Sequence, residues 1–313
     1  MKILNREIMP GESVQINLDT VRLHTRTRID VPVIIERAKE DGPVLLIIAG
    51  IHGDEVNGVE IVRKAVSSNM LRPDKGTVIC IPVLNVFGFL NQRREFPDGK
   101  DLNRYFPGSE KGSLASQFAA TFMKEIVPHS NYCIDFHTGG SNRFNIPQIR
   151  ISKNDETLLQ LANAFHPQFI VYANNRDKSF RESATKEGLK VLLFEGGKSL
   201  DFNNAVTDAG LNGIMRLMHA IGMRDYATSI NQNNLKDPII IEQSYWHRAR
   251  HSGLFRSFIN GGEYIMKGHT LGSISDPFGE FEYQIKAKTN GHIIGLNYSP
   301  IVTEGDALYH IGN

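Results

Sequence analysis

An apolar run leads directly into a polar turn in Val44-Leu45-Leu46-Ile47-Ile48-Ala49-Gly50-Ile51-His52-Gly53-Asp54-Glu55. A helical pattern of apolar residues begins at Val56, so this stretch predicts a strand, a tight turn and a helix. His52 and Glu55 are three positions apart at the mouth of that helix, where both side chains can face one point. Because imidazole nitrogens and carboxylate oxygens are zinc ligands, the turn is a candidate metal site.

A second predicted strand supplies the third candidate ligand. The run Tyr132-Cys133-Ile134-Asp135-Phe136-His137 is mostly apolar, and small residues follow in Thr138-Gly139-Gly140. In open α/β sheets the carboxyl ends of parallel strands lie side by side and ligands bind beyond them, so His137 can join His52 and Glu55. Two histidines and one glutamate form a catalytic zinc set with one position left open.

The composition excludes several classes of partner. The 313 residues carry 35 basic and 34 acidic side chains, so the overall charge predicts attraction neither to nucleic acid nor to membranes. Charges interrupt the first ten residues too early for a signal peptide, and no apolar run reaches the ~18 residues of a membrane span. We expect a cytoplasmic protein, and the sequence leaves homo-oligomer formation open. Cys80 and Cys133 lie in apolar runs and are interpreted as buried thiols.

The order of predicted elements divides the chain into two unequal parts. Strand and helix patterns alternate over most of residues 1–226, which indicates an α/β catalytic domain. Residues 227–238 are polar, lack aromatic side chains and are interpreted as a linker. The segment 239–313 has short β-like runs separated by glycines and no helix pattern, so we expect a small accessory all-β domain there.

The C-terminal segment also contains a faint internal repeat. Four residues of its first half match four of its second half at offsets of 38, 37, 37 and 37: Gly253, Gly268, Leu271 and Ile274 against Gly291, Gly305, Leu308 and Ile311. This spacing fits two similar β units and suggests a small two-fold barrel or sandwich. Chance agreement among glycines is the alternative, because the segment is rich in glycine.

Two further stretches place polar groups where chemistry is expected. Residues 85–112 show no sustained period and are too long for an ordinary connection, which in a compact domain usually marks a functional loop. This loop contains Arg93-Arg94 and Asp101-Leu102-Asn103-Arg104. The apolar strand 190–197 ends in Glu195 and two glycines. Alone, Glu195 would be interpreted as a surface residue, but the other polar strand ends favour a functional role.

Four motifs in this order resemble the succinylglutamate desuccinylase/aspartoacylase family of zinc carboxypeptidase-like deacylases. They are Gly50-Ile51-His52-Gly53-Asp54-Glu55, Asp101-Leu102-Asn103-Arg104, the strand end at His137, and Phe194-Glu195-Gly196-Gly197. The likeness covers residues 40–225. It implies a zinc carboxypeptidase-like three-layer domain with a central mixed sheet. The C-terminal segment is similar to the accessory β domain of that family, which implies a barrel-sandwich-like fold.

The resemblance implies the metal site that the residues themselves favour. His52, Glu55 and His137 would hold one Zn²⁺ per chain, and Asp101 would accept a hydrogen bond from the far nitrogen of His52. Zinc lowers the pKa of water toward ~7 and so supplies a nucleophile at neutral pH. Glu195 would be the general base that takes the proton of this water and delivers it to the departing amine.

The resemblance also implies which groups meet the substrate. Asn103 and Arg104 would clamp a carboxylate, because a guanidinium group matches a carboxylate with two parallel hydrogen bonds. Arg94 would polarise the scissile carbonyl and stabilise its oxyanion, although adjacent Arg93 leaves the register open. Arg181, on the helix before Glu195, is similar to a family arginine that meets a carboxylate of the acyl chain.

The sequence therefore predicts a zinc-dependent hydrolase, an amidohydrolase that cleaves the amide bond of a small N-acyl amino acid or a similar N-acylated amine. A metallocarboxypeptidase acting on short peptides is the alternative with the same metal chemistry. A non-catalytic metal-binding protein is a third interpretation. Closed structural zinc sites usually have four ligands rich in cysteine, and neither cysteine of this chain is placed to help.

Overall fold

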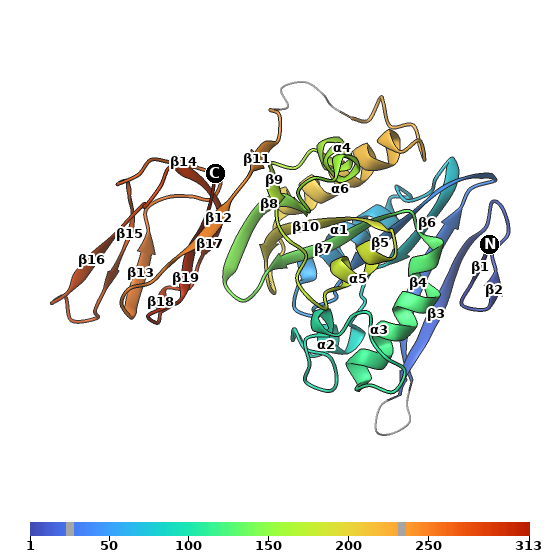
Figure 1. Ribbon diagram of the computed structural model, residues 1–313, viewed down its shortest axis with the longest axis horizontal. Helices are drawn as coiled ribbons and strands as arrows, with labels where there is room; N and C mark the ends of the chain where they lie inside the picture. Colours follow the sequence, from blue (N-terminus) through green and yellow to red (C-terminus); the bar gives the residue numbers. More distant parts are fainter. Residues whose placement is uncertain (23–27, 231–235) are drawn as a thin grey trace.

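A computed structural model of the chain describes residues 1–22, 28–230 and 236–313 (Figure 1). Its helices are α1 (Val56–Ser67), α2 (Val86–Leu90), α3 (Leu114–Glu125), α4 (Glu156–Phe165), α5 (Phe180–Lys186) and α6 (Asn204–Ala220), with 3-10 turns η1 (Leu102–Arg104) and η2 (Val127–His129). The strands of the larger part are β1 (Lys2–Ile3), β2 (Arg6–Glu7), β3 (Ser13–Arg22), β4 (Arg28–Arg37), β5 (Glu40–Ala49), β6 (Lys75–Ile81), β7 (Tyr132–Gly139), β8 (Arg143–Ile151), β9 (Phe169–Tyr172) and β10 (Lys190–Lys198). The later strands are β11 (Ile239–Ile241), β12 (Ser244–Arg248), β13 (Gly253–Ser257), β14 (Tyr264–Ile265), β15 (Thr270–Ser275), β16 (Glu282–Lys286), β17 (Gly291–Asn297), β18 (Ile301–Val302) and β19 (Ala307–Gly312).

One mixed sheet of 13 strands runs through the larger part of the molecule and continues into the C-terminal strands. Its main path is β12-β19-β17-β8-β10-β7-β5-β6-β4-β3. The central strands β6, β5, β7 and β10 are parallel, whereas β8 and β4 flank them antiparallel. The prediction of an α/β fold with a large central mixed sheet is therefore confirmed.

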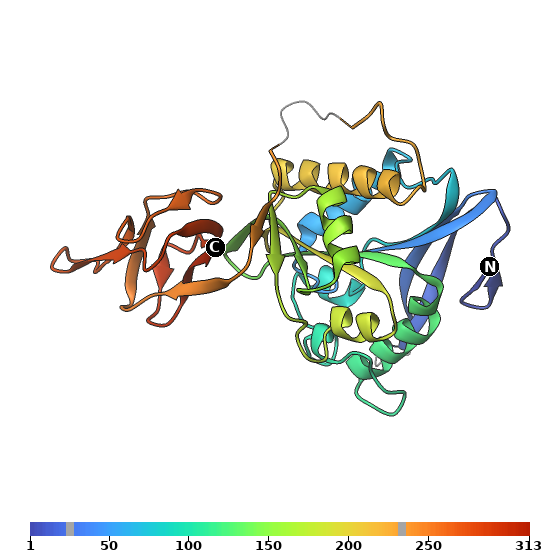
Figure 2. The same ribbon diagram turned by 45° about the horizontal axis from the view of Figure 1, so that its top comes forward.

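Helices cover both faces of the sheet, and the alternation of β5 shows how the two cores divide (Figure 2). Leu45 and Ile47 pack on one face with the apolar sides of α1, α4 and α6. Leu46 and Ile48 pack on the other face with α3 and α5. All four side chains are fully buried, which explains why the strand is continuously apolar rather than alternating.

The C-terminal strands form a separate apolar core, and they carry the internal repeat in three dimensions. Strand β13 pairs antiparallel with β15, and β17 pairs in the same way with β19. The first glycine of each unit meets a backbone carbonyl: a Cβ on Gly253 would lie 2.4 Å from Ser275 O, and one on Gly291 would lie 2.6 Å from Gly312 O. Gly253 and Gly291 therefore have the same structural role, which favours a true repeat over chance agreement.

The two parts of the chain are joined by backbone pairing as well as by the chain itself. Strand β17 pairs with β8, with Gly295 opposite Asn145, so the central sheet continues into the C-terminal strands. Strand β11, which begins at residue 239, pairs with β9 of the larger part. Of the predicted linker 227–238, residues 231–235 lie outside the described residues, and the domain boundaries remain a proposal. None of the described helices is long and apolar enough to cross a membrane.

Candidate active site

The turn between β5 and α1 places His52 and Glu55 together. Two glycines make this turn: Gly50 has a φ of +63°, which suits a residue without Cβ, and Gly53 lies against the backbone of α2. A Cβ on Gly53 would lie 1.9 Å from the carbonyl carbon of Gly88. His52 Nδ1 lies 2.7 Å from Glu55 Oε1, and both side chains are buried. The sequence interpretation of this stretch as strand, turn and helix is confirmed.

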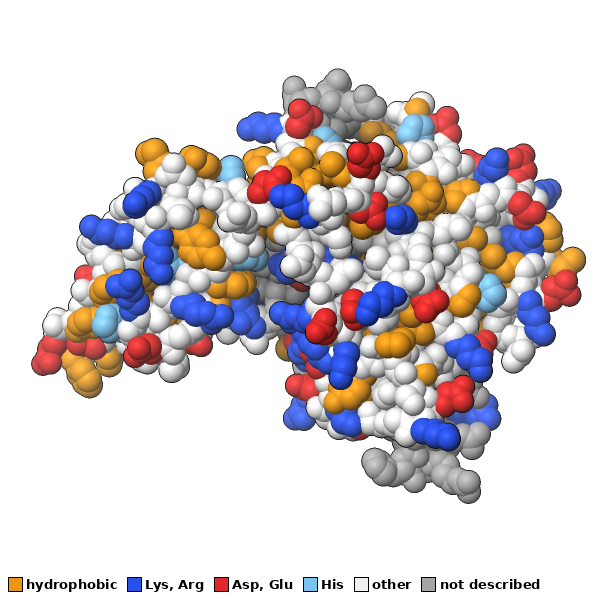
Figure 3. Space-filling view, in the orientation of Figure 1, with side chains coloured by type: hydrophobic (Ala, Val, Ile, Leu, Met, Phe, Trp, Pro, Cys, Tyr) orange, Lys and Arg blue, Asp and Glu red, His pale blue; other side chains and the backbone are white. Residues whose placement is uncertain are grey.

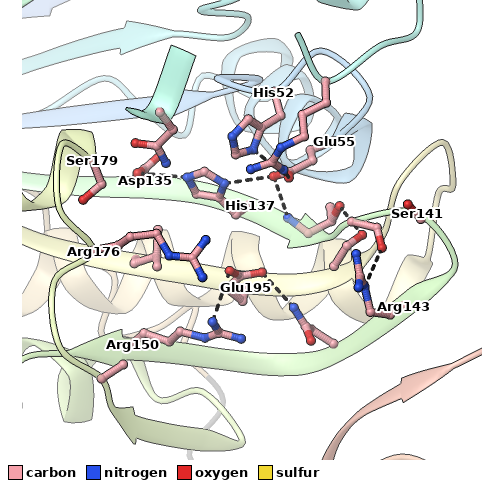
Figure 4. A pocket seen from close by; sticks show the side chains of 18 of the residues that line it. His52, Glu55, Asp135, His137, Ser141, Arg143, Arg150, Arg176, Ser179 and Glu195 are labelled. Carbon is pink, nitrogen blue, oxygen red and sulfur yellow. Dashed lines mark hydrogen bonds and ion pairs between the residues drawn. The ribbon is translucent and has the colours of Figure 1, made fainter. Parts of the chain in front are cut away.

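His137 reaches the same point from the neighbouring strand β7. Its Nδ1 lies 2.9 Å from Glu55 Oε2, and the backbone N–H of Thr138 donates to the same oxygen at 3.0 Å. Ligand atoms of His52, Glu55 and His137 all lie within 4.8 Å of one another. The parallel register of β5 and β7 therefore brings together the three residues that the sequence analysis selected (Figure 4).

Each histidine has a carboxylate behind it. His52 Nε2 lies 3.1 Å from Asp101 Oδ1, as predicted for Asp101, and His137 Nε2 lies 3.0 Å from Asp135 Oδ2. Such carboxylates orient an imidazole and raise its basicity as a ligand. Burial disfavours the charged form of Glu55, but His52 and His137 outweigh it and hold its pKa well below the usual range. The ionised carboxylate of Glu55 therefore faces the same point as the two imidazoles.

Arg94, rather than Arg93, reaches this site. Arg94 Nη1 donates to Glu55 Oε1 at 3.1 Å, and Arg94 Nη2 donates to Asp101 Oδ2 at 2.9 Å. Arg93 is exposed and does not line the cavity described below. Burial disfavours the charge of Arg94, but the carboxylates of Glu55 and Asp101 outweigh this effect and raise the pKa of Arg94. A fixed guanidinium cation thus stands beside the histidine-glutamate cluster.

Glu195 lies opposite His137 in the pairing of β10 with β7. Its Oε2 accepts a hydrogen bond from Asn145 Nδ2 at 2.8 Å, and its Oε1 lies 3.6 Å from Arg150 Nη1. Asn145 and Arg150 both come from β8, the antiparallel neighbour of β10. Figure 4 shows the Glu195 carboxylate in the middle of the cavity, beneath the histidine-glutamate cluster.

The three predicted substrate-binding residues have different surroundings. Arg104 has only a long contact to Asp101, with 3.8 Å between Nη2 and Oδ2, and a bond from its Nη1 to the Asn103 carbonyl. Asn103 is buried, and its Oδ1 accepts from the backbone N–H of Phe180 at 2.8 Å. Arg181 is also buried, and its guanidinium donates to the carbonyl oxygens of Arg150, Ala173 and Asn174. Burial and the repulsion of Arg150 lower the pKa of Arg181 to about 10.

A cavity of about 840 Å³ is lined by the histidine-glutamate cluster, Arg94, Glu195 and the three predicted substrate-binding residues. Asp101 is not part of its lining. Its wall also includes Trp246, Arg248 and Ala307 from the C-terminal strands. The sheet continuation through β8 and β17 explains their presence, because it brings β12 and β19 to the edge of the cavity. A volume of this size suits a small molecule.

Comparisons with known proteins agree with this geometry. The family model described as the succinylglutamate desuccinylase/aspartoacylase catalytic domain matches residues 41–221. The chain belongs to this family. The match contains every candidate ligand and substrate-binding residue named above, and it ends before the C-terminal strands begin.

The relatives within the succinylglutamate desuccinylase/aspartoacylase family are deacylases. The chain is 25% identical to N-alpha-acetyl-L-2,4-diaminobutyric acid deacetylase of Halomonas elongata, over 89% of this chain and 84% of that protein. It is 31% identical to succinylglutamate desuccinylase of Pseudomonas aeruginosa, over 38% of this chain and 36% of that protein. A crystal structure of succinylglutamatedesuccinylase/aspartoacylase from Rhodobacter sphaeroides has a TM-score of 0.83 at 22% identity and covers 96% of this chain and 94% of that one, which shows a shared fold.

The donor set fits a zinc ion. Two imidazoles and one carboxylate are a common zinc set in catalytic sites, and His52, Glu55 and His137 supply it from buried positions. Asp101 and Asp135 give each imidazole the outer partner that such ligands usually have. Among the described residues, this is the only group of three or more histidine, cysteine or acidic side chains whose ligand atoms converge. Three protein ligands leave the fourth position of a zinc ion open for solvent or substrate.

Sequence reasoning missed three residues of the site. Asp135 precedes His137 by two positions and so shares its face of β7, a signal that the period of a strand could have given. Asn145 and Arg150 gave no such signal, because their place beside Glu195 depends on β8 running antiparallel to β10.

Proposed function

We propose that this protein is a zinc-dependent hydrolase that cleaves the amide bond of a small N-acyl amino acid. The observation that carries the proposal is the convergence of His52, Glu55 and His137 beside a carboxylate, Glu195, in one cavity. Membership of a family whose relatives are named as a deacetylase and desuccinylases supports the same reaction. One Zn²⁺ held by the three ligands would act as a Lewis acid and lower the pKa of water toward ~7.

Glu195 is the general base in this proposal. It takes a proton from the attacking water and passes it to the amine nitrogen, while the water oxygen bonds to the acyl carbon and the C–N bond breaks. The second proton of the water also ends on this nitrogen, so the products are a carboxylate and an ammonium group, and atoms and charge balance. The hydrogen bond from Asn145 fixes one oxygen of Glu195 and leaves the other to face the substrate or Arg150.

Arg94 and Arg104 divide the recognition of the substrate. Arg94 lies beside Glu55, where its guanidinium can stabilise the oxyanion that forms on the scissile carbonyl. The contact of Arg104 with Asp101 is long, at 3.8 Å, so its guanidinium can form two parallel bonds to the carboxylate of the amino acid. Asn103 holds the start of α5 and lies beside this carboxylate position.

For Arg181 the contacts favour a task other than the one that the resemblance implies. Three of its five N–H donors already bind the carbonyls of Arg150, Ala173 and Asn174, which leaves few for a direct contact with an acyl carboxylate. We propose that Arg181 positions the loop after β9, whose residues line the cavity. It then acts on the substrate through that loop.

The architecture belongs to the proposal as well. Residues 1–226 would be a zinc carboxypeptidase-like three-layer catalytic domain, and 239–313 an accessory barrel-sandwich-like domain that narrows the cavity through Trp246 and Ala307. This narrowing favours small substrates over the extended chains that a carboxypeptidase binds. The cytoplasmic location and the oligomeric state remain predictions.

A substrate screen tests the proposed function. Purified protein would be offered acetyl-, succinyl- and longer-chain acyl-amino acids together with dipeptides, before and after chelation. We expect hydrolysis of an acyl-amino acid that chelation abolishes and Zn²⁺ restores. A preference for dipeptides would instead support the metallocarboxypeptidase, and stoichiometric zinc without turnover on any substrate would support a non-catalytic metal-binding protein.

A further inference from the structure

A buried glutamine lies behind the cavity wall, where the C-terminal strands join the larger part. Gln148 is on β8, opposite Glu195 of β10, and its side chain is fully buried. Arg150 and Glu195 line the cavity, whereas Gln148 does not. A fully buried amide needs hydrogen-bond partners, so the partners of Gln148 show what it does.

The amide nitrogen of Gln148 donates to two backbone carbonyls. One belongs to Ile146 of the same strand, at 3.1 Å, and the other belongs to Ile294 of β17, at 3.0 Å. Carbonyl oxygens only accept, so these contacts use both N–H groups of the amide and turn its oxygen the other way. The backbone therefore fixes the orientation of the Gln148 amide.

The carbonyl of Ile294 lies where the strand pairing is interrupted. The pairing of β17 with β8 reaches Gly295, opposite Asn145, and does not extend to Ile294. The pairing of β17 with β19 shifts its register between Ile293 and Gly295. A residue at such a bulge lies outside the regular ladder of hydrogen bonds. Gln148 satisfies this carbonyl and thereby ties the C-terminal strands to β8.

The amide oxygen of Gln148 holds Arg150. Arg150 Nε donates to Gln148 Oε1 at 3.3 Å, and Arg150 Nη1 lies 3.6 Å from Glu195 Oε1. Over residues 1–22, 28–230 and 236–313, Gln148 Oε1 is the only atom that accepts a hydrogen bond from this guanidinium. The contact with Glu195 is longer than a hydrogen bond. The direction of the Arg150 side chain therefore depends on Gln148.

Arg150 needs such an anchor because other cations lie nearby. Figure 3 shows basic side chains gathered in the hollow where the C-terminal strands meet the larger part. Burial and the repulsion of Arg150 lower the pKa of Arg181, which shows how strongly the two charges interact. This repulsion acts on Arg150 as well, so a fixed acceptor is needed to keep its guanidinium beside Glu195.

We infer that Gln148 is a positioning residue for the proposed base: it holds Arg150 against one oxygen of Glu195, while the Ile294 carbonyl of β17 holds Gln148. Asn145 binds the other oxygen of that carboxylate, so β8 orients both oxygens. This inference rests on the proposed function, in which Glu195 is the base. Gln148 acts through Arg150 and not on the substrate.

Gln148→Met tests the inference in the zinc-loaded protein, because methionine has a similar shape but lacks the amide. We expect kcat to fall by about ten- to a hundredfold with KM nearly unchanged, since a misplaced base slows the chemical step and not binding. Zinc content should equal that of the parent. The control is Gln160→Met, an exposed glutamine of α4 outside the cavity, which should behave as the parent.

A double-mutant cycle with Arg150→Met separates positioning from a purely structural role. Two effects of Gln148→Met, on kcat and on melting temperature, are compared in the parent and in Arg150→Met. The effect on kcat should disappear without Arg150, because Gln148 then has nothing to position. The effect on melting temperature should remain, because the carbonyls of Ile146 and Ile294 lose their donor in either background.

A measurement without turnover reads the contact itself. The Nε–H signal of Arg150 in NMR spectra, assigned by its loss in Arg150→Met, reports the hydrogen bond through its exchange with water. We expect slow exchange in the parent and in Gln160→Met, and fast exchange in Gln148→Met. Fast exchange in the parent would overturn the inference even if Gln148→Met failed to fold.

A Gln148→Met variant with the kcat of the parent would overturn the inference, as would an equal loss of kcat with and without Arg150. A rise in KM at constant kcat would do the same, because Arg150 would then serve substrate binding. If the parent hydrolyses no N-acyl amino acid, the proposed function fails instead. The Nε–H signal still decides in that case whether Gln148 holds Arg150, so the two failures are distinguishable.

Discussion

Asn145 donates a hydrogen bond from Nδ2 to Oε2 of Glu195, at 2.8 Å. Asn145 itself lies between Gly197 of β10 and Gly295 of β17, so the C-terminal strands support the residue that orients the proposed base. A Cβ on Gly295 would lie 3.0 Å from Asn145 Oδ1, which leaves little room for movement. In the proposed mechanism, this relationship would let the C-terminal strands help to orient the general base.

Asn145→Asp tests this role through the pH profile. The substitution places a second carboxylate beside Glu195, and two neighbouring like charges raise the pKa of one of them. The acidic limb of kcat/KM should therefore move to higher pH, while zinc content stays the same. Asn163→Asp, an exposed site on α4, adds the same charge elsewhere and serves as the control. An unshifted limb in Asn145→Asp would show that Asn145 does not act on the base.

Asp135 should control the affinity for zinc through His137. Asp135→Asn keeps the shape but weakens the hydrogen bond to His137 Nε2, and loss of such an outer partner typically costs ~10–100-fold in metal affinity. Competition with a chromophoric chelator measures the effect. His137→Ala should lose the metal altogether. Asp135→Asn with the affinity of the parent would mean that His137 is oriented by other contacts.

Arg104→Lys should weaken recognition of the amino-acid carboxylate. Lysine keeps the charge but cannot form two parallel bonds, and the loss of one charge-assisted bond costs roughly 1.5–3 kcal/mol, or about ten- to a hundredfold in kcat/KM. The measurement compares an N-acyl amino acid with its α-carboxamide, and zinc content should not change. If parent and variant discriminate equally between acid and amide, Arg104 is not the clamp.

His310 should make stability depend on pH. It is buried, stacks on Trp246 with ring centroids 4.6 Å apart, and donates or accepts a bond at Ser244 Oγ. Burial and the charge of Arg150 lower its pKa to about 3. Between this value and the unfolded value of ~6.5 only the unfolded chain takes up the proton, so stability should fall as pH falls through this window.

Thermal unfolding across pH 7 to 4 measures this effect. The parent should lose stability more steeply than His310→Asn, which lacks the titrating group. The control, His269→Asn, changes an exposed histidine and should behave as the parent. Parallel pH dependences for the parent and His310→Asn would contradict the prediction.

The convergence of the three candidate metal ligands was predictable from the sequence because it depends on a regular feature of the fold. His52 and Glu55 follow β5, His137 lies near the carboxyl end of β7, and parallel strands align their carboxyl ends. Asn145 was not predictable in this way, since its position depends on the direction and register of β8. Arg248 enters the cavity only because the sheet continues through β17 and β19, a pairing that no local pattern signals. Burial distinguishes Arg94 from Arg93 in the structure. The sequence could not make this distinction, because the two side chains are chemically identical and adjacent.

The most direct test of zinc-dependent hydrolysis with Glu195 as the base is a paired measurement on Glu195→Gln. Zinc per chain and kcat on the best N-acyl amino acid are determined on the same preparation. We expect about one zinc per chain in both parent and variant and a loss of turnover of roughly a hundredfold or more, because glutamine cannot accept the proton. A variant with full zinc and near-normal turnover would contradict the assignment of Glu195, and a parent that hydrolyses equally well without zinc would contradict the metal-dependent mechanism.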